Sequence, residues 1–334
     1  MKAIFVTVLL TALPTLVVAD DAKTLKDLAT YFGLANISGP IEIVDCTLSK
    51  GTQSQCFRIT TSHIPATYEP GPWCPTSTTD TADAGGIWLE SGKVLDVDGA
   101  FITRLTTLYD DPNWQLYDAN TGEIRYTKTL EACQLAARPD VAEEYQNHCV
   151  QCLPEHMPDG HTVTYTIPIT PENTWLKNDI RHSGSGVAHN GVRLDAAAPL
   201  DAILSAYTVA PFDDCGGHVN PNVGYHYHAV TDCLQDAPAT FGGISAVDAL
   251  TANLGPQIGI AMDGYPIFDH TLTTGDVPDG LDKCNGTNSD GLGYRYHAGA
   301  AGSNAILGCL KAETGCVSTD ADAYCDASAR PPRP

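Results

Sequence analysis

Three histidines lie close together in the segment CGGHVNPNVGYHYHA, residues 215–229: His218, His226 and His228. If the tyrosine-rich stretch is a strand, His226 and His228 share one face, because side chains alternate along a strand. Imidazoles from one loop and one strand face are a suitable ligand set for a transition metal. We therefore predict a metal site at these three residues, with zinc or copper favoured over calcium because imidazole is a borderline ligand.

The same residues also allow a purely structural interpretation. Tyr225 and Tyr227 would pack into the core while the imidazoles donate to backbone carbonyls, as buried polar side chains commonly do. No glutamate follows at the spacing of cupin metal sites, and Asp232 is the nearest acidic substitute. The sequence leaves the metal site and the structural role open.

A second version of this pattern follows later in the chain. CNGTNSDGLGYRYHA (284–298) aligns without a gap on 215–229, and GIAMDGYPI upstream of it resembles GVAHNGVRL upstream of the first segment. Asn-Gly and Asp-Gly turns between apolar runs are typical of β-hairpins. We predict two tandem β units, about 186–233 and 259–309, that pack about a pseudo-twofold axis with both Tyr-x-Tyr-His strands in one domain.

The second version differs in the residues that could do chemistry. Thr287 and Arg295 occupy the positions of the first two histidines. Arg295 and His297 would share a strand face, and a cation beside an imidazole suits a carboxylate or sulfate. Together with Tyr227 and His228 they suggest a second hypothesis, a lyase or hydrolase acting on an acidic polysaccharide, in which Tyr227, Arg295 and His297 are the catalytic candidates. A surface arginine paired with an acid, or a non-catalytic adhesion or scaffold module, is the simpler alternative.

The Gly-containing turns upstream of the two motifs also differ. Alignment places His189 and Asn190 opposite Met262 and Asp263. All four are expected to be turn residues first. Asp263 could also coordinate a metal or polarise a histidine, if its turn folds over the nearby Tyr-x-Tyr-His strand.

The amino-terminal segment predicts export. Residues 1–19 resemble a secretory signal peptide, with Lys2 before an apolar run and Ala19 before the acidic Asp20. Pro14 interrupts this run, which is shorter than the roughly 20 residues of a spanning helix. We expect a secreted or periplasmic protein without a membrane span after signal cleavage.

Twelve cysteines support that expectation, since an even number in an exported chain predicts disulfides. Cys149 and Cys152 form a CxxC motif near several histidines, which could bind zinc in a reducing compartment, but export favours oxidised cysteines here. Four pairs are predicted from their positions around turns and strands: Cys46–Cys56, Cys215–Cys233, Cys284–Cys309 and Cys316–Cys325.

The formal net charge of −22 bears on possible partners. Such an acidic chain repels nucleic acid and anionic membranes, so we expect neither as a partner. The partners that the motifs suggest are a metal ion and an anionic carbohydrate. The latter depends on the Arg295 hypothesis alone.

The segments DDCGGHVNPNVGYHYHA, IGIAMDGYPIF and LDKCNG together resemble the YHYH-domain family of exported proteins, over about residues 160–316. The resemblance implies an architecture and candidate residues but no particular reaction. The family often carries histidine where Thr287 and Arg295 stand here, so we do not expect two equivalent metal sites.

The expected fold class is mainly β and disulfide-stapled. A smaller mixed α+β region is expected over 20–155, where LKDLATYFGL and part of TLEACQLAARPDVAEEYQNHC look helical. Pro139 should end or kink the second helical segment. The YHYH domain is expected over 156–316, followed by a disulfide-linked tail at 317–334.

Overall fold

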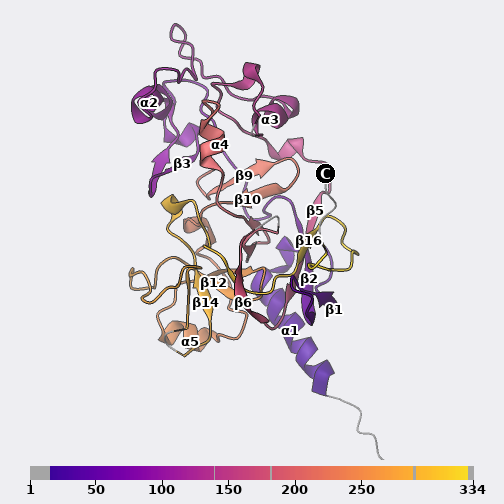
Figure 1. Ribbon diagram of the computed structural model, residues 1–334. Coiled ribbons are helices and arrows are strands. Elements are labelled where there is room, and N and C mark those ends of the chain that lie inside the picture. The colour runs from indigo at the N-terminus through magenta and orange to yellow at the C-terminus, as the bar shows by residue number, and fades with distance from the viewer. Residues whose placement is uncertain (1–15, 139, 181–182, 289–290, 330–334) are drawn as a thin grey trace, which may run out of the picture.

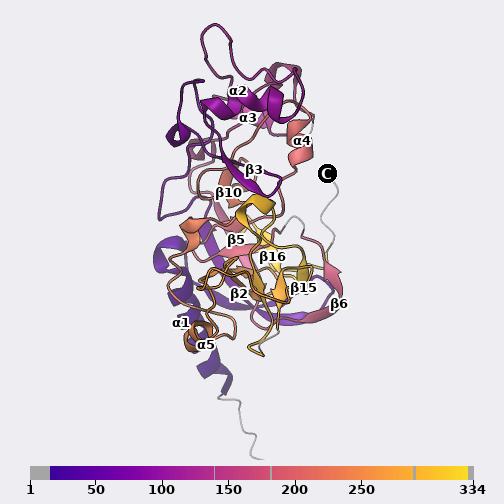
Figure 2. The same ribbon diagram turned by 90° about the vertical axis from the view of Figure 1, so that its left-hand side faces the viewer.

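The structure is a computed structural model that describes residues 16–138, 140–180, 183–288 and 291–329 (Figures 1 and 2). Strand accounts for 25% and helix for 19%, so the class is mixed and strand-rich. The expected mainly β class is correct about the dominance of strands and too narrow about the helices. Most of the expected signal peptide, 1–15, lies outside the described residues, and residues 16–19 begin helix α1 (Leu16–Phe32).

Eight strands of the described chain form the central sheet. It contains both Tyr-x-Tyr-His strands, β10 and β14, as the sequence predicted. In sheet order the strands are β13 (Gly286–Thr287), β14 (Arg295–His297), β12 (Pro266–Phe268), β11 (Gln257–Ala261), β7 (Gly186–Ala188), β8 (Arg193–Leu194), β10 (Gly224–Tyr227) and β9 (Gly217–Asn220).

The pairing within this sheet explains how residues far apart in sequence meet. β7 and β8 form an antiparallel pair, β10 lies parallel to β8, and β9 returns antiparallel to β10. On the other side β11 and β12 are antiparallel, β14 lies parallel to β12, and β13 returns antiparallel to β14. The two halves meet where β7 pairs with β11. Two tandem units would give this order, and their relation by a pseudo-twofold axis stays a prediction.

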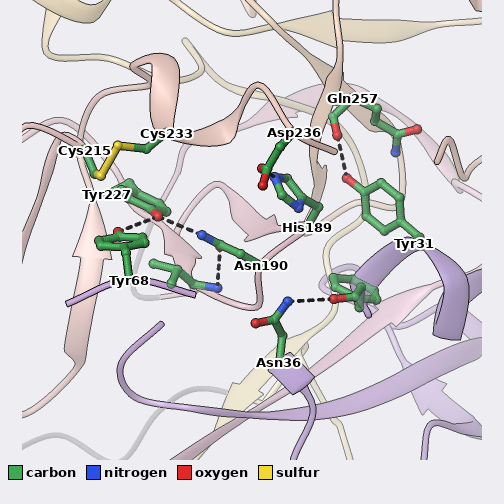
Figure 3. Close-up of polar contacts among 12 residues, drawn as sticks. Tyr31, Asn36, Tyr68, His189, Asn190, Cys215, Tyr227, Cys233, Asp236 and Gln257 are labelled. Atoms are coloured by element: carbon green, nitrogen blue, oxygen red, sulfur yellow. Dashed lines mark hydrogen bonds and ion pairs between the residues drawn. A yellow bond between two sulfur atoms is a disulfide. The ribbon is translucent and has the colours of Figure 1, made fainter. Parts of the chain in front are cut away.

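A second sheet joins the amino-terminal region to the rest. Its order is β1 (Glu42–Thr47), β2 (Gln53–Ser62), β5 (Thr162–Pro168) and β16 (Cys316–Ser318). Strands from both sides of the expected boundary at 155–156 therefore share one sheet. Helix α1 buries Leu28, Tyr31 and Phe32 in the same core, and the Tyr31 hydroxyl donates to the Gln257 carbonyl at 3.0 Å (Figure 3).

The remaining elements of the amino-terminal region lie together at one end of the molecule, close to β9 and β10 (Figure 1). A separate core of apolar side chains, including Trp88 and Phe101, holds them. Asp98 and Thr129 cap the helices α2 (Gly99–Leu108) and α3 (Leu130–Ala136) through their side chains. α3 ends at Ala136, shortly before Pro139, the residue expected to end this helix. The elements are β3 (Ile87–Glu90), β4 (Lys93–Asp96), α2 (Gly99–Leu108) and α3 (Leu130–Ala136).

Shorter elements complete the described chain. α4 (Leu200–Leu204) lies near α3, whereas α5 (Ala246–Thr251) lies at the opposite end of the molecule (Figure 1). β6 (Asn173–Asn178) pairs with β15 (Leu310–Ala312). The 3₁₀ turns are Leu34–Asn36, Ala82–Ala84, Glu143–Tyr145, Pro154–His156, Asp232–Leu234 and Ala301–Ser303.

Six disulfides account for the twelve cysteines, all of which lie in the described chain. The four predicted pairs are confirmed. The two cysteines of the CxxC motif form no zinc site: Cys149 bonds Cys74 and Cys152 bonds Cys133. These two bridges tie the amino-terminal elements to the segment that enters the central domain.

The central tyrosines of the two motifs are buried, as predicted. Tyr227 and Tyr296 are both 0% exposed. The Tyr227 hydroxyl accepts from the Asn190 amide at 2.9 Å and shares a hydrogen bond of 2.7 Å with Tyr68 (Figure 3). The Tyr296 hydroxyl instead donates to the Asp263 carboxylate at 2.7 Å. Among the hydrogen bonds described for Asp263, the side-chain donor is a tyrosine and the others are backbone amides such as those of Lys311 and Ala312, so the expected contact with a histidine is not among them.

These matched tyrosines yield a stability prediction. Tyr227→Phe removes bonds to neutral groups and should lower the free energy of unfolding by about 1 kcal/mol. Tyr296→Phe deprives a buried carboxylate of a donor and should cost about 2–3 kcal/mol at pH 7.5. Urea denaturation of both variants measures the difference. Equal losses would contradict the distinction.

Candidate metal site

Three imidazoles converge at one edge of the central sheet. β9 and β10 pair antiparallel, and this register places His218 directly opposite His226. His228 follows β10 on the same face as His226. The ring centroids are 4.8 Å apart for His218 and His226, 5.0 Å for His218 and His228, and 4.8 Å for His226 and His228. The structure therefore brings together the three predicted ligands in a nearly equilateral triangle.

Backbone carbonyls fix the orientation of two of the rings. His226 Nδ1 lies 3.0 Å from the Gly224 carbonyl oxygen, and His228 Nδ1 lies 2.6 Å from that of Ala196. A carbonyl only accepts, so each Nδ1 carries the hydrogen of the neutral ring. The lone pair then resides on Nε2, the arrangement found in histidines that bind metals.

Burial favours the neutral form of the three rings. His226 is 4% and His228 6% exposed, and His218 is half-buried. Desolvation lowers the pKa of all three imidazoles, and the neighbouring rings of the triad add to this for His218 and His228; the pKa of His228 falls to about 3. Phe212 packs against the triad, with its ring centroid 4.9 Å from that of His218. Neutral imidazole is the form that coordinates a metal.

Sequence reasoning missed Asp195 and Ala196, which lie beside the histidines. β8 ends just before them, and its parallel pairing with β10 aligns Arg193 with His226. The Asp195 amide donates to the Tyr227 carbonyl at 2.9 Å, which holds this segment against β10. Burial raises the pKa of Asp195, but the Arg193 guanidinium, the neighbouring imidazoles and the Ala196 amide together outweigh it, so that pKa lies below its usual value. No local sequence motif marks Asp195 and Ala196. They could have been found by asking which strand pairs in parallel with the YHYH strand, because they follow that strand.

A cavity of about 320 Å³ opens over the triad. All three histidines and Asp195 line one side of it. The other side comes from the end of α3, from α4 and from the segment 150–152. Figure 1 shows α3 and α4 on the same side of the molecule as β9 and β10.

The catalytic candidates do not meet at this cavity. Arg295 lies opposite Thr287 in the β13–β14 pair, and β14 is separated from β10 by four strands, or roughly 24 Å at normal strand spacing. Arg295 and His297 are 3% and 0% exposed. The described lining of the cavity contains neither of them, nor Tyr227. The catalytic role of Tyr227, Arg295 and His297 stays a prediction. This cavity does not bring the three residues together.

The scaffold around His297 nevertheless matches that around His228. His297 Nδ1 lies 2.9 Å from the Asp269 carbonyl oxygen, just as His228 Nδ1 bonds the Ala196 carbonyl. Both carbonyls follow the strand that runs parallel to the motif strand. The two places therefore differ at the positions of His218 and His226. The backbone carbonyl that supports the last histidine is present in both.

Comparison with known proteins places the triad within a recognised domain. The YHYH protein family model matches residues 164–285. This range contains the three histidines, and it ends before β14. No curated protein and no solved structure matches the chain.

The hydrogen bonds at the triad predict a tautomer and a pH response. In metal-free ¹⁵N-labelled protein, His226 and His228 should give two-bond ¹H–¹⁵N correlations of Nδ1–H rings. The lowered pKa values mean that the folded protein binds fewer protons than the unfolded chain below about pH 6.5, so protonation of these rings opposes folding there. The resonances of His228 should stay those of a neutral ring as the pH falls to about 5.5, and His226 should titrate below its usual midpoint of about 6.5. Titration with a midpoint near 6.5 would contradict the burial argument.

Proposed function

Since the chain carries a YHYH protein family domain over residues 164–285, we propose that this domain holds one transition-metal ion on His218, His226 and His228. One observation supports this most. A ligand atom from each of the three imidazoles lies within 4.8 Å of the others, and backbone carbonyls hold two of the rings with Nε2 as the lone-pair atom. A structural role alone would need the Nδ1 bonds but not the convergence of three rings.

Zinc and copper suit this donor set. Three neutral imidazoles at 2.0–2.1 Å from a tetrahedral ion would have nitrogens about 3.3 Å apart, so the triangle contracts modestly as the ion binds. The triad lines the cavity, which leaves room for a fourth ligand on that side. Metal sites with three histidines and an open fourth position are typical of catalysis rather than of structural support.

One ion per chain follows from the second part of the proposal, that the two halves of the sheet are tandem units related by a pseudo-twofold axis. The matching strand order and the matching Nδ1 contacts of His228 and His297 support this relation. In the second unit Thr287 and Arg295 stand where two ligands would be needed. An arginine is not a metal ligand at neutral pH, so that unit would hold no equivalent ion.

The setting of the proposed site is oxidising. Six disulfides in the described chain fit an extracellular or periplasmic protein, because such bonds persist there. Export by a cleaved signal peptide at 1–19 is part of this proposal. Among the residues that the structure describes, none of the helices has the length and apolar character needed to cross a bilayer.

Metal analysis tests the proposal. Protein purified without a histidine tag, loaded separately with Zn²⁺ and Cu²⁺ and desalted, should retain one ion per chain of at least one of the two metals. The His226→Ala/His228→Ala variant should retain almost none, because one imidazole alone binds weakly. Mass spectrometry of the metal content gives the result.

A matched control carries the same loss of two histidines elsewhere. His148→Ala/His156→Ala changes two residues outside the cavity lining and should retain metal as the wild type does. Bound ion should also raise the melting temperature of the wild type and of this control, but not that of the triad variant. Equal substoichiometric metal in all three proteins would overturn the proposal.

A further inference from the structure

The cavity over the triad has a shape and lining that select a ligand. We propose that it binds a compact aromatic molecule, which coordinates the metal ion through one oxygen-bearing group. This inference rests on the proposed metal site, because the ion anchors the ligand. It identifies the class of ligand that would occupy the fourth coordination position of that ion.

The walls of the cavity are mainly apolar. α4 contributes Ala202 and Ile203, the end of α3 contributes Ala136, and Val150 lies beside them. The indole of Trp73 also lines the cavity, and its Nε1 donates to the Gly217 carbonyl at 3.0 Å, which fixes the ring against β9. An apolar wall with one large fixed ring favours a flat apolar ligand.

Several polar groups of the lining already have partners. Arg138, which also lines the cavity, donates to the Asp140 carbonyl at 3.1 Å. The Thr208 hydroxyl donates to the Ile203 carbonyl at 2.7 Å. Asp195 accepts from Arg193 at 3.1 Å and from the Ala196 amide at 2.8 Å. A sugar acid carries hydroxyls on every side and would lose hydrogen bonds to water in this cavity. The negative net charge of the chain also disfavours an anionic polymer.

Volume limits the size of the ligand. A dry engineered cavity of about 150 Å³ holds benzene, and the cavity here has about 320 Å³. The space therefore accommodates one aromatic ring with a substituent that reaches the triad.

The amino-terminal region sets this limit, although it lies outside the matched family range. Two disulfides, Cys74–Cys149 and Cys133–Cys152, fix α3 and the segment 150–152 as the far wall. A wall fixed before binding lowers the entropy cost of enclosing a ligand. The region therefore acts as a specificity element for the metal site in the central sheet.

The test compares two ligands that share a coordinating group. Wild type loaded with the ion that it retains, zinc where it retains both, is titrated calorimetrically with benzohydroxamate and with acetohydroxamate. Benzohydroxamate should bind at least about tenfold more tightly, because only its ring fills the apolar space. Ala202→Phe should fill that space, abolish this preference and leave acetohydroxamate affinity within about twofold.

Ala246→Phe is the matched control, since Ala246 is exposed on α5 and does not line the cavity. It should keep the wild-type preference. Ala137→Phe, which fills the cavity from the α3 side, serves as a second test if Ala202→Phe melts at a much lower temperature.

The outcomes separate the two proposals. Wild type that retains no metal overturns the metal site and this inference with it. Wild type that retains zinc or copper but binds both hydroxamates equally, or binds galacturonate more tightly than benzohydroxamate, overturns this inference alone. A preference for benzohydroxamate that persists in both Ala202→Phe and Ala137→Phe also overturns this inference alone.

Discussion

A buried carboxylate, Asp213, holds the loop on which the histidine triad depends. Its two oxygens accept from the Tyr225 hydroxyl at 2.8 Å, and Oδ1 also accepts from the Cys215 and Gly217 amides at 3.1 Å. Burial raises its pKa to about 6 against these hydrogen bonds. Because Gly217 begins β9, the carboxylate sets the register that places His218 opposite its partner. This anchor fixes the start of the strand that carries the first ligand.

The second half of the sheet uses the same anchor without the same ligands. Asp282 accepts from the Cys284 amide at 2.8 Å, from the Gly286 amide at 3.2 Å and from the Tyr294 hydroxyl at 3.2 Å. A disulfide follows each anchor at the cysteine. Such shared contacts preserve a backbone while leaving side chains on the strand face free to change. Metal chemistry in one half and none in the other is compatible with one scaffold.

Local patterns in the sequence predicted what local geometry determines. Alternation along a strand gave the shared face of His226 and His228, and positions around hairpins gave four disulfides. Pairs such as Cys74–Cys149, separated by 75 residues, have no local signal. Asp195 and the cavity walls escaped for the same reason, since parallel pairing and packing of the amino-terminal region bring them to the site. Local sequence also could not show that Asp263 would bind a tyrosine, because that bond depends on how its turn packs.

The energetics of the triad favour a binding role over a purely structural one. Each buried imidazole costs desolvation, and their mutual proximity further disfavours charge on His218 and His228. Apolar side chains of similar size would pack the same space without that cost. One backbone bond per ring satisfies Nδ1 of His226 and His228 and leaves Nε2 as the lone-pair atom. A cation shared by the three lone pairs would offset this cost, which supports the proposal that these residues serve function rather than stability.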